Sequence, residues 1–417
     1  MRAGILKSVG SIGANALVVL LFTIAPTPSV VAVGGPHLVE LPPPTGPYAV
    51  GQTVFYWTDS SRLETLTENP GDHRELRVLL WYPAQAEAGQ PLAPYSRDLA
   101  ILTGLLERSQ ISLLGRVQGH SIERAPIART PTHFPFLIFS HGNQSNSWLY
   151  TALHEELASN GYVVVAVDHP YDALAVPLSD GHIAAFAERA WSQARASSSK
   201  DEMDFYRSRV KVRVSDILFV LTKMDELDEG RYGKQFNGRL DLGRVGVFGH
   251  SIGGVAAAEA CHVESRLKAC LNLDGVILGG PFFSGEGPEQ PFMFILREKP
   301  APSHEELAAM KLTQKQWEES HQSLLARQEA LLTAVGSGSF RVVIKNASHE
   351  SFSDESFLLE ASAGGDTAAE RNTVEIVRAL VVAFLDQCMK GKTRRVLESV
   401  AKKYPDVEMA RFSHENR

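Results

Sequence analysis

The stretch Val247–Gly254, VFGHSIGG, holds one serine with a glycine two residues before it and two residues after it. A serine hydroxyl in such a G-x-S-x-G turn can attack a carbonyl carbon once a base removes its proton. The apolar residues before Ser251 are typical of a strand, and the alanine-rich stretch after Gly254 is typical of a helix. Gly249 and Gly253 lack the Cβ atoms that would collide across so sharp a turn. We therefore predict that Ser251 is a nucleophile; the alternative is an ordinary loop serine.

A near-copy of the motif, GHSIE, occurs at Gly119–Glu123. It follows no clear strand, lacks the second glycine and does not continue as a helix. Ser121 is therefore interpreted as a loop serine.

A nucleophilic serine needs a base, and the base needs a carboxylate that fixes its tautomer. After a serine turn of this kind the chain order is serine, then acid, then histidine. Asp274 closes the apolar stretch Ala269–Leu273 and is the candidate acid, although Asp before Gly275 is also typical of a turn that bonds its own backbone. Asp168 ends an earlier strand but precedes the serine, so it is interpreted as structural or pocket-lining.

His349 is the candidate base, because it follows the apolar stretch Phe340–Ile344 by a few residues and its loop can reach back over the sheet edge. The alternative is a capping or loop histidine. His304 and His321 fall in a charged segment and His414 in the tail, so none of these three is favoured.

An oxyanion formed by attack on an ester needs two N–H donors. Ile252, directly after the nucleophile, is expected to supply one. The loop Ser140–Asn143 follows another strand, and we expect the Asn143 N–H to supply the other. His141 is interpreted as structural rather than as a second base.

The elements that must position these residues alternate along the chain. Strands are predicted at 76–82, 134–139, 162–167, 245–248, 269–273, 292–296 and, as the last, 340–344; helices are predicted at 148–160, 207–227, 254–261 and 373–389. Repeated strand–helix units predict an α/β fold with a mostly parallel central sheet and helices on both faces.

Two helical insertions are expected, at 98–117 and at about 303–335, the second with two helices. We expect a signal peptide at 1–32, a Pro/Gly-rich extended arm at 33–51, one catalytic domain at 52–392 and a charged tail at 393–417. The leucines of residues 98–117 form a helical stripe that either packs on the core or contacts a lipid surface.

The N-terminal segment predicts export, because Arg2 and Lys7 precede an apolar run that is short for a membrane span, and Ala32 offers a cleavage edge. An uncleaved anchor is the alternative. Removing residues 1–32 changes the net charge from −7 to −9, which makes nucleic acid an unfavoured partner. Cys261 and Cys270 are close enough to pair or to remain buried thiols, and no Cys/His cluster has zinc spacing.

Together these motifs resemble the secreted-type platelet-activating-factor acetylhydrolases, a branch of the α/β-hydrolases. The resemblance covers most of residues 40–390 and departs from the family pattern at Ile252, where an aromatic residue is expected, and in the length of the insertion His304–Ala334. It is carried by Pro44–Gly51, Phe136–Gly142, Gly161–Val167, Gly249–Gly254, Leu273–Gly275 and Ser348–Phe352.

The resemblance implies an α/β-hydrolase fold and a triad of Ser251, Asp274 and His349. It also implies hydrolysis, without calcium or any other cofactor, of short or oxidised sn-2 acyl chains of phospholipids. Two alternatives are a broad carboxylesterase or polyester hydrolase with the same triad, and an inactive homologue that only binds lipid or protein.

Overall fold

The computed structural model describes residues 38–67, 69–197, 199–276, 288–310, 312–335, 338–363, 368–392 and 395–412. The expected signal peptide and His414 lie outside these residues. Within the described ranges, no helix is both long and apolar enough to cross a bilayer.

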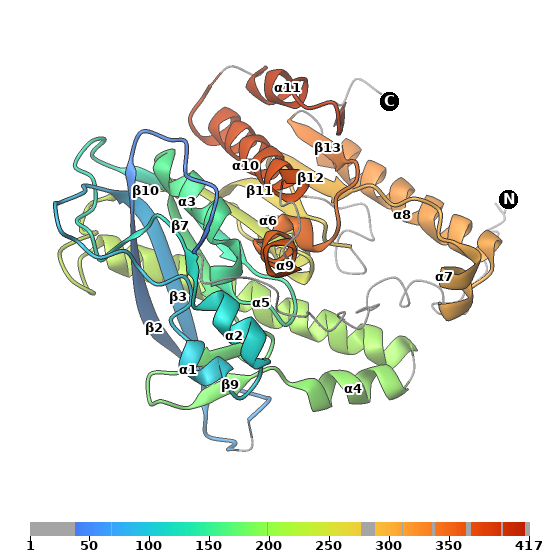
Figure 1. Cartoon of the computed structure of the whole chain (residues 1–417), viewed down its shortest axis with the longest axis horizontal. Helices are drawn as coiled ribbons and strands as arrows, with labels where there is room; N and C mark the ends of the chain where they lie inside the picture. The colour runs from blue at the N-terminus through green and yellow to red at the C-terminus, as the bar shows by residue number, and fades with distance from the viewer. Residues whose placement is uncertain are drawn as a thin grey trace, which may run out of the picture.

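The described residues build a ten-stranded sheet in the order β14-β13-β12-β11-β10-β6-β7-β3-β2-β5 (Figure 1). Pairing is parallel from β7 through β6, β10, β11 and β12 to β13, and antiparallel where β3 meets β7, β2 meets β3 and β14 meets β13. The mostly parallel sheet is therefore confirmed. Its strands are β2 (Ala49–Leu63), β3 (His73–Ala84), β5 (Ile122–Glu123), β6 (Phe134–Ser140), β7 (Val163–Asp168), β10 (Leu240–His250), β11 (Leu267–Leu273), β12 (Phe292–Arg297), β13 (Ser339–Ile344) and β14 (Val407–Phe412).

Helices cover both faces of this sheet, as predicted (Figure 1). On β7, Val163, Val165 and Val167 pack in one core layer with α5 (Ser199–Asp228) and α6 (Ile252–Val263). The alternate residues Val164 and Ala166 pack in the opposite layer with α3 (Thr151–Ser159) and α10 (Ala368–Met389). A strand buried on both faces reads as a continuous apolar run, which is why this segment of sequence is unbroken by polar residues.

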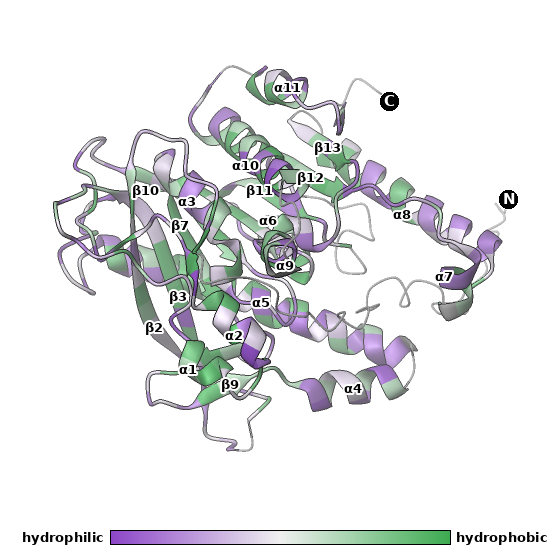
Figure 2. Ribbon diagram, viewed as in Figure 1, coloured by the Kyte–Doolittle hydropathy of each residue, from purple (hydrophilic) through white to green (hydrophobic). Residues whose placement is uncertain are grey.

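The first insertion holds two short helices, α1 (Leu99–Leu102) and α2 (Arg108–Leu114). Five leucines of its stripe, at 99, 102, 106, 113 and 114, belong to one apolar cluster, and only Leu105 of the six is exposed. The stripe therefore packs inward. The second insertion holds α7 (His304–Ala309) and α8 (Gln314–Val335), which confirms two helices. Figure 2 shows hydrophilic residues along α7, α8 and α4 (Glu188–Ser197), whereas the central strands are mostly hydrophobic.

Several strands lie where none was predicted, and β14 and β2 are the longest of them. The tail carries α11 (Val396–Ala401) and β14, which pairs with β13, so the prediction that 340–344 is the last strand was wrong. The strand β2 begins inside the expected arm, at Ala49, and pairs along its length with β3. Smaller sheets join β1 (Val39–Glu40) to β4 (Val117–Gln118), and β8 (Ala175–Pro177) to β9 (Ile183–Ala185).

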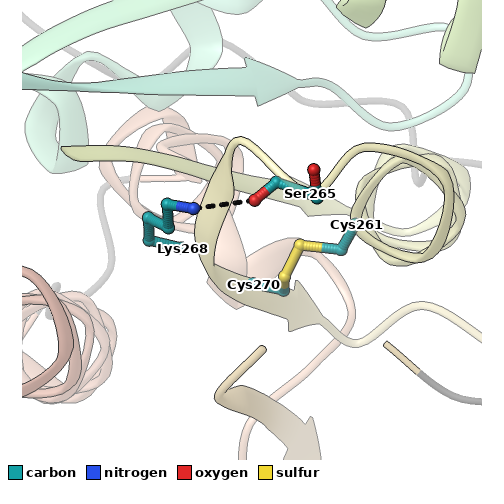
Figure 3. Close-up of a disulfide and its surroundings, with 4 residues drawn as sticks. All are labelled: Cys261, Ser265, Lys268 and Cys270. Atoms are coloured by element: carbon teal, nitrogen blue, oxygen red, sulfur yellow. Dashed lines mark hydrogen bonds between the residues drawn. A yellow bond between two sulfur atoms is a disulfide. The ribbon is translucent and has the colours of Figure 1, made fainter. Parts of the chain in front are cut away.

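A disulfide joins Cys261 near the end of α6 to Cys270 on β11, across a Cα–Cα distance of 6.3 Å (Figure 3). The turn between them is also held by a hydrogen bond from Lys268 Nζ to the Ser265 carbonyl, at 2.8 Å. The pairing left open by the sequence is thus present, and it ties the helix that follows Ser251 to the strand that leads to Asp274.

Candidate active site

Ser251 occupies a sharp turn between β10 and α6. Its φ of 55° lies in the left-handed region, which a residue with a Cβ adopts only under constraint. Its N–H donates to the Leu273 carbonyl on the neighbouring strand β11, at 2.9 Å. The expected strand–turn–helix context of Ser251 is therefore present, and the side chain is half-buried at the carboxyl end of the sheet.

Three glycines allow this turn to close. A Cβ on Gly253 would lie 2.0 Å from the Ser140 carbonyl oxygen, and a Cβ on Gly249 would lie 2.3 Å from the Gly253 carbonyl oxygen. A Cβ on Gly275 would lie 2.4 Å from the Ser251 carbonyl oxygen. Each contact is with backbone, which cannot move aside as a flexible side chain can, so these positions require glycine.

Asp274 follows β11, the strand next to β10, and is buried. Its Oδ2 accepts a hydrogen bond from His349 Nδ1 at 2.7 Å. Arg297 donates from its backbone N–H to Oδ1 at 3.3 Å and from Nε to Oδ2 at 3.2 Å. Burial acts to raise the pKa of Asp274, but the His349 hydrogen bond and the nearby positive charges of Lys299 and Arg297 outweigh it and hold the pKa below its usual value. The carboxylate is therefore ionised at neutral pH.

His349 stands after β13, at the start of the 3₁₀ turn η5 (Glu350–Phe352), with its side chain 35% exposed. Its ring centroid lies 4.5 Å from that of His250, the residue directly before Ser251. Because Nδ1 is engaged by Asp274, Nε2 is the ring nitrogen left to exchange a proton with another group. The structure thus brings the candidate base to the candidate acid and to the immediate neighbour of the candidate nucleophile.

The loop after β6 lies against the nucleophile turn. A Cβ placed on Gly142 would be 3.6 Å from Ser251 Cβ. The Gly142 N–H donates to the Tyr150 hydroxyl at 3.1 Å, and the Gln144 N–H donates to the Asp172 carbonyl at 2.8 Å. The Asn143 N–H between them has no acceptor among the described residues.

Ile252 begins α6, and the first N–H groups of a helix have no partner within it. In the described part of the chain neither the Asn143 N–H nor the Ile252 N–H has an acceptor, which is the arrangement expected of two oxyanion donors.

Buried charged side chains of α5 and Asp172 hold the loop that follows β6. Arg213 on α5 donates to the His141 carbonyl, and it pairs with the Asp172 carboxylate at 3.2 Å. Arg209 pairs with the same carboxylate at 2.8 Å. Burial and the charge of Arg213 hold the pKa of His141 well below its usual value, and its Nε2 accepts the His169 N–H at 3.0 Å. His141 is thus a neutral buried histidine, which agrees with its structural interpretation.

The remaining candidates lie apart from this constellation. Asp168 is fully buried and pairs with Arg77 at 2.7 Å, which agrees with a structural role. Ser121 Oγ donates to the buried Glu155 Oε1 at 2.6 Å, so Ser121 is a loop serine anchored to α3, directly before the short strand β5. His321 stacks on Trp317, with ring centroids 4.9 Å apart on α8.

The sequence did not single out Tyr150, Asp172, Arg213 or Arg297. Asp172 follows the end of β7, and that position at the carboxyl edge of the sheet was a usable signal. Tyr150 and Arg213 lie within helical patterns, and nothing in those patterns distinguishes them from other core-facing residues.

Comparisons with known proteins agree with this geometry. Residues 34–393 match the family model "Platelet-activating factor acetylhydrolase, isoform II". A probable 1-alkyl-2-acetylglycerophosphocholine esterase of Arthroderma benhamiae is 25% identical over 401 residues, covering 89% of this chain and 94% of the relative. A platelet-activating factor acetylhydrolase of Cavia porcellus is 27% identical over 249 residues, covering 56% of this chain and 55% of the relative.

Among solved structures, a ferulic acid esterase from Streptomyces cinnamoneus superposes with a TM-score of 0.67 at 25% identity, covering 89% of this chain and 99% of that one. The fold is accordingly that of the α/β-hydrolases. A family model that spans the strands, the serine turn and the histidine loop alike means that the chain belongs to the platelet-activating factor acetylhydrolase, isoform II, family and is a carboxylic ester hydrolase.

Proposed function

We propose that this chain hydrolyses short or oxidised sn-2 acyl esters of phospholipids through an acyl-enzyme formed on Ser251. The observation that carries the proposal is the 2.7 Å hydrogen bond between His349 Nδ1 and Asp274 Oδ2, beside a serine held in a left-handed turn. The substrate class is supported by the relatives, whose names specify acetylglycerophosphocholine and platelet-activating factor.

In the proposed first half-reaction, Ser251 Oγ attacks the ester carbonyl while His349 Nε2 takes its proton. Asp274 holds the imidazole through Nδ1 and stabilises the imidazolium that forms. The N–H groups of Asn143 and Ile252 bind the tetrahedral oxyanion. Collapse breaks the ester C–O bond, and His349 returns the proton to the departing alcohol, the lysophospholipid.

In the second half-reaction, His349 removes a proton from water, and the resulting nucleophile attacks the acyl group on Ser251. The same two N–H groups bind the second oxyanion. Collapse releases the short carboxylic acid and restores the serine hydroxyl. Every proton transfer in this cycle uses the one imidazole.

A substrate panel tests the substrate class. The purified chain is given phospholipids with sn-2 acetyl or sn-2 palmitoyl groups, a nitrophenyl ester and a feruloyl ester. We expect kcat/KM for the acetyl phospholipid to exceed that for the palmitoyl and feruloyl esters by about tenfold or more, because a pocket shaped for a short acyl group penalises a longer or bulkier one. A preference for the nitrophenyl or feruloyl ester would contradict the phospholipid assignment.

A broad carboxylesterase is the second candidate, and the superposition on a ferulic acid esterase favours it. The same panel separates the two, because a broad esterase would hydrolyse the nitrophenyl and feruloyl esters at least as well as the phospholipid. An inactive homologue would hydrolyse none of them and would not react with a fluorophosphonate probe.

We also propose that residues 1–32 are an export signal that is removed, and that the esterase acts outside the cytoplasm. The support is the two basic residues before an apolar run and the small residue Ala32. N-terminal sequencing of the exported protein is expected to begin near Val33; a chain that retains Met1 would contradict removal.

A further inference from the structure

Tyr150 lies between the parts of the candidate active site without being one of its reacting groups. It ends the 3₁₀ turn η3 (Ser147–Tyr150), which leads directly into α3, and it is fully buried. Its hydroxyl oxygen accepts the Gly142 N–H at 3.1 Å and lies 2.8 Å from His250 Nδ1. One oxygen therefore links the loop that carries Asn143 to the strand that leads to Ser251.

Both partners of the second hydrogen bond are uncharged. Burial raises the pKa of Tyr150 well above its usual value, against the opposing effect of hydrogen bonds from Ser145 and Gly142, so the phenol keeps its proton. Burial holds the pKa of His250 well below its usual value, so that ring is neutral. The Tyr150 hydroxyl and Nδ1 of His250 are therefore joined by a hydrogen bond between two neutral groups, and the tautomer of His250 sets which of them donates.

The His250 ring, which the Tyr150 hydroxyl bonds, packs against the candidate base His349. Its ring centroid is 4.5 Å from that of His349, and it stacks on Phe352 with centroids 5.9 Å apart and an interplanar angle of 22°. The His349 ring therefore packs against a surface whose orientation is set by the Tyr150 hydroxyl.

The segment around Tyr150 also contacts the histidine loop through the backbone. The Asp354 N–H donates to the Leu149 carbonyl at 2.6 Å, and the Asp354 carboxyl accepts the Ala152 N–H at 3.3 Å. The start of α3 thus touches the oxyanion loop, the nucleophile strand and the histidine loop at once.

We propose that the Tyr150 hydroxyl is a positioning group that holds the oxyanion loop in register with Ser251 and His349. This proposal rests on the proposed acyl-enzyme mechanism. Removing the oxygen leaves the buried Gly142 N–H and His250 Nδ1 without this partner, and each regains one only if the loop or the ring moves. Such movement displaces the Asn143 N–H from the oxyanion, which forms during reaction, and leaves ground-state binding of the ester unchanged.

The test compares Tyr150→Phe with Tyr162→Phe. Tyr162 is also a fully buried tyrosine, and its hydroxyl donates to Asp386 Oδ1 at 2.9 Å, away from the candidate site. We expect Tyr150→Phe to lower kcat about 10- to 100-fold with KM changed less than about threefold, since loss of a group that acts in the transition state lowers kcat. The rate of fluorophosphonate labelling should fall in parallel. Tyr162→Phe should keep kcat and the labelling rate within about twofold of the parent while losing a similar amount of thermal stability.

Equal kcat in Tyr150→Phe and the parent, or equal losses in the two tyrosine variants, would overturn the proposal. Should Tyr150→Phe not fold, His250→Asn and His250→Leu replace it. The Asn side-chain amide can take the place of Nδ1 as donor or as acceptor to the Tyr150 hydroxyl, whereas Leu can do neither, so His250→Asn should retain at least about fivefold more kcat than His250→Leu. Equal kcat in these two variants would likewise overturn it. A parent protein that neither turns over esters nor reacts with the probe refutes the proposed mechanism itself, which is a separate result.

Discussion

Replacing Gly253 by alanine tests whether the serine turn is closed as tightly as its geometry indicates. The added Cβ would lie 2.0 Å from the Ser140 carbonyl oxygen, and 2.5 Å and 2.6 Å from the Ser140 carbonyl carbon and the His141 carbonyl oxygen. An unstrained contact needs at least about 3.4 Å, so the first turn of α6 and the end of β6 must separate by about 1.4 Å. Ser251 and the Ile252 N–H move with that turn.

A displacement of about 1 Å at a reacting group costs on the order of 10²-fold in rate. We therefore expect Gly253→Ala to lower kcat/KM for a short-chain ester by at least about 100-fold and to slow fluorophosphonate labelling in parallel. Both are measured on protein whose folding has been verified by circular dichroism.

Gly243→Ala is the matched control, because Gly243 lies on β10, the strand that leads into the serine turn, and its added Cβ would meet only the Asp241 carboxylate, at 3.4 Å. It should keep kcat/KM within about threefold. If folded Gly253→Ala retained the activity of the parent, the reasoning that glycine is required to seat Ser251 would be refuted.

Three further changes give distinct outcomes. Asp274→Asn should lower kcat by about 10³- to 10⁴-fold, because an amide no longer fixes the His349 tautomer, and a loss under tenfold in steady-state assays would contradict the role of the acid. Burial outweighs the charge of Lys211 and raises the pKa of Glu259 to about 7 in the folded protein, above its value in the unfolded chain. The protonated side chain therefore contributes fully to the free energy of unfolding at low pH, and this contribution is lost as pH rises through about 7. Glu259→Gln should therefore raise the unfolding free energy at pH 8 by about 1–2 kcal/mol, allowing for partial exposure, and by much less at pH 5; urea titrations giving the same change at both values would argue against this sign. Replacing Cys261 and Cys270 by alanine opens a short loop and should lower the unfolding free energy by about 2–3 kcal/mol, whereas an unchanged denaturation midpoint would mean that the disulfide adds nothing.

Much of the sheet follows from sequence because its central strands are buried on both faces. The run that forms β7 is apolar at every position from Val163 to Val167, and no other element of that length fits such a pattern as well. Edge strands lack this signal. The strand β14 reads VEMARF and is only half-buried, so its backbone pairing with β13, rather than its side chains, recruits it to the sheet.

The start of α5 shows a related limit. The periodic apolar pattern begins near Arg207, yet the helix starts at Ser199. Its extra residues mix both kinds of side chain: Lys200 pairs with Asp204 at i,i+4 spacing, while Met203, Phe205 and Tyr206 pack against the core. Charged residues interrupt the apolar pattern in this segment, so periodicity alone misses the first turns of the helix.

The candidate site also has residues that the sequence predicts and residues that it does not. Ser251, Asp274 and His349 each follow a strand in the expected chain order, so local pattern and topology were enough to name them. The groups that hold them in place were not predictable in this manner. Arg213 meets the His141 carbonyl across 72 residues of chain, and a buried pairing at that distance is set only by how the helices pack on the sheet.

The most direct test of the central claim is to react the purified protein with a fluorophosphonate and locate the label by peptide mass spectrometry. We expect one labelled serine, Ser251, with no labelling and at least about 10³-fold lower esterase turnover in Ser251→Ala. Label on another serine, such as Ser121, or esterase activity that survives Ser251→Ala, would contradict it.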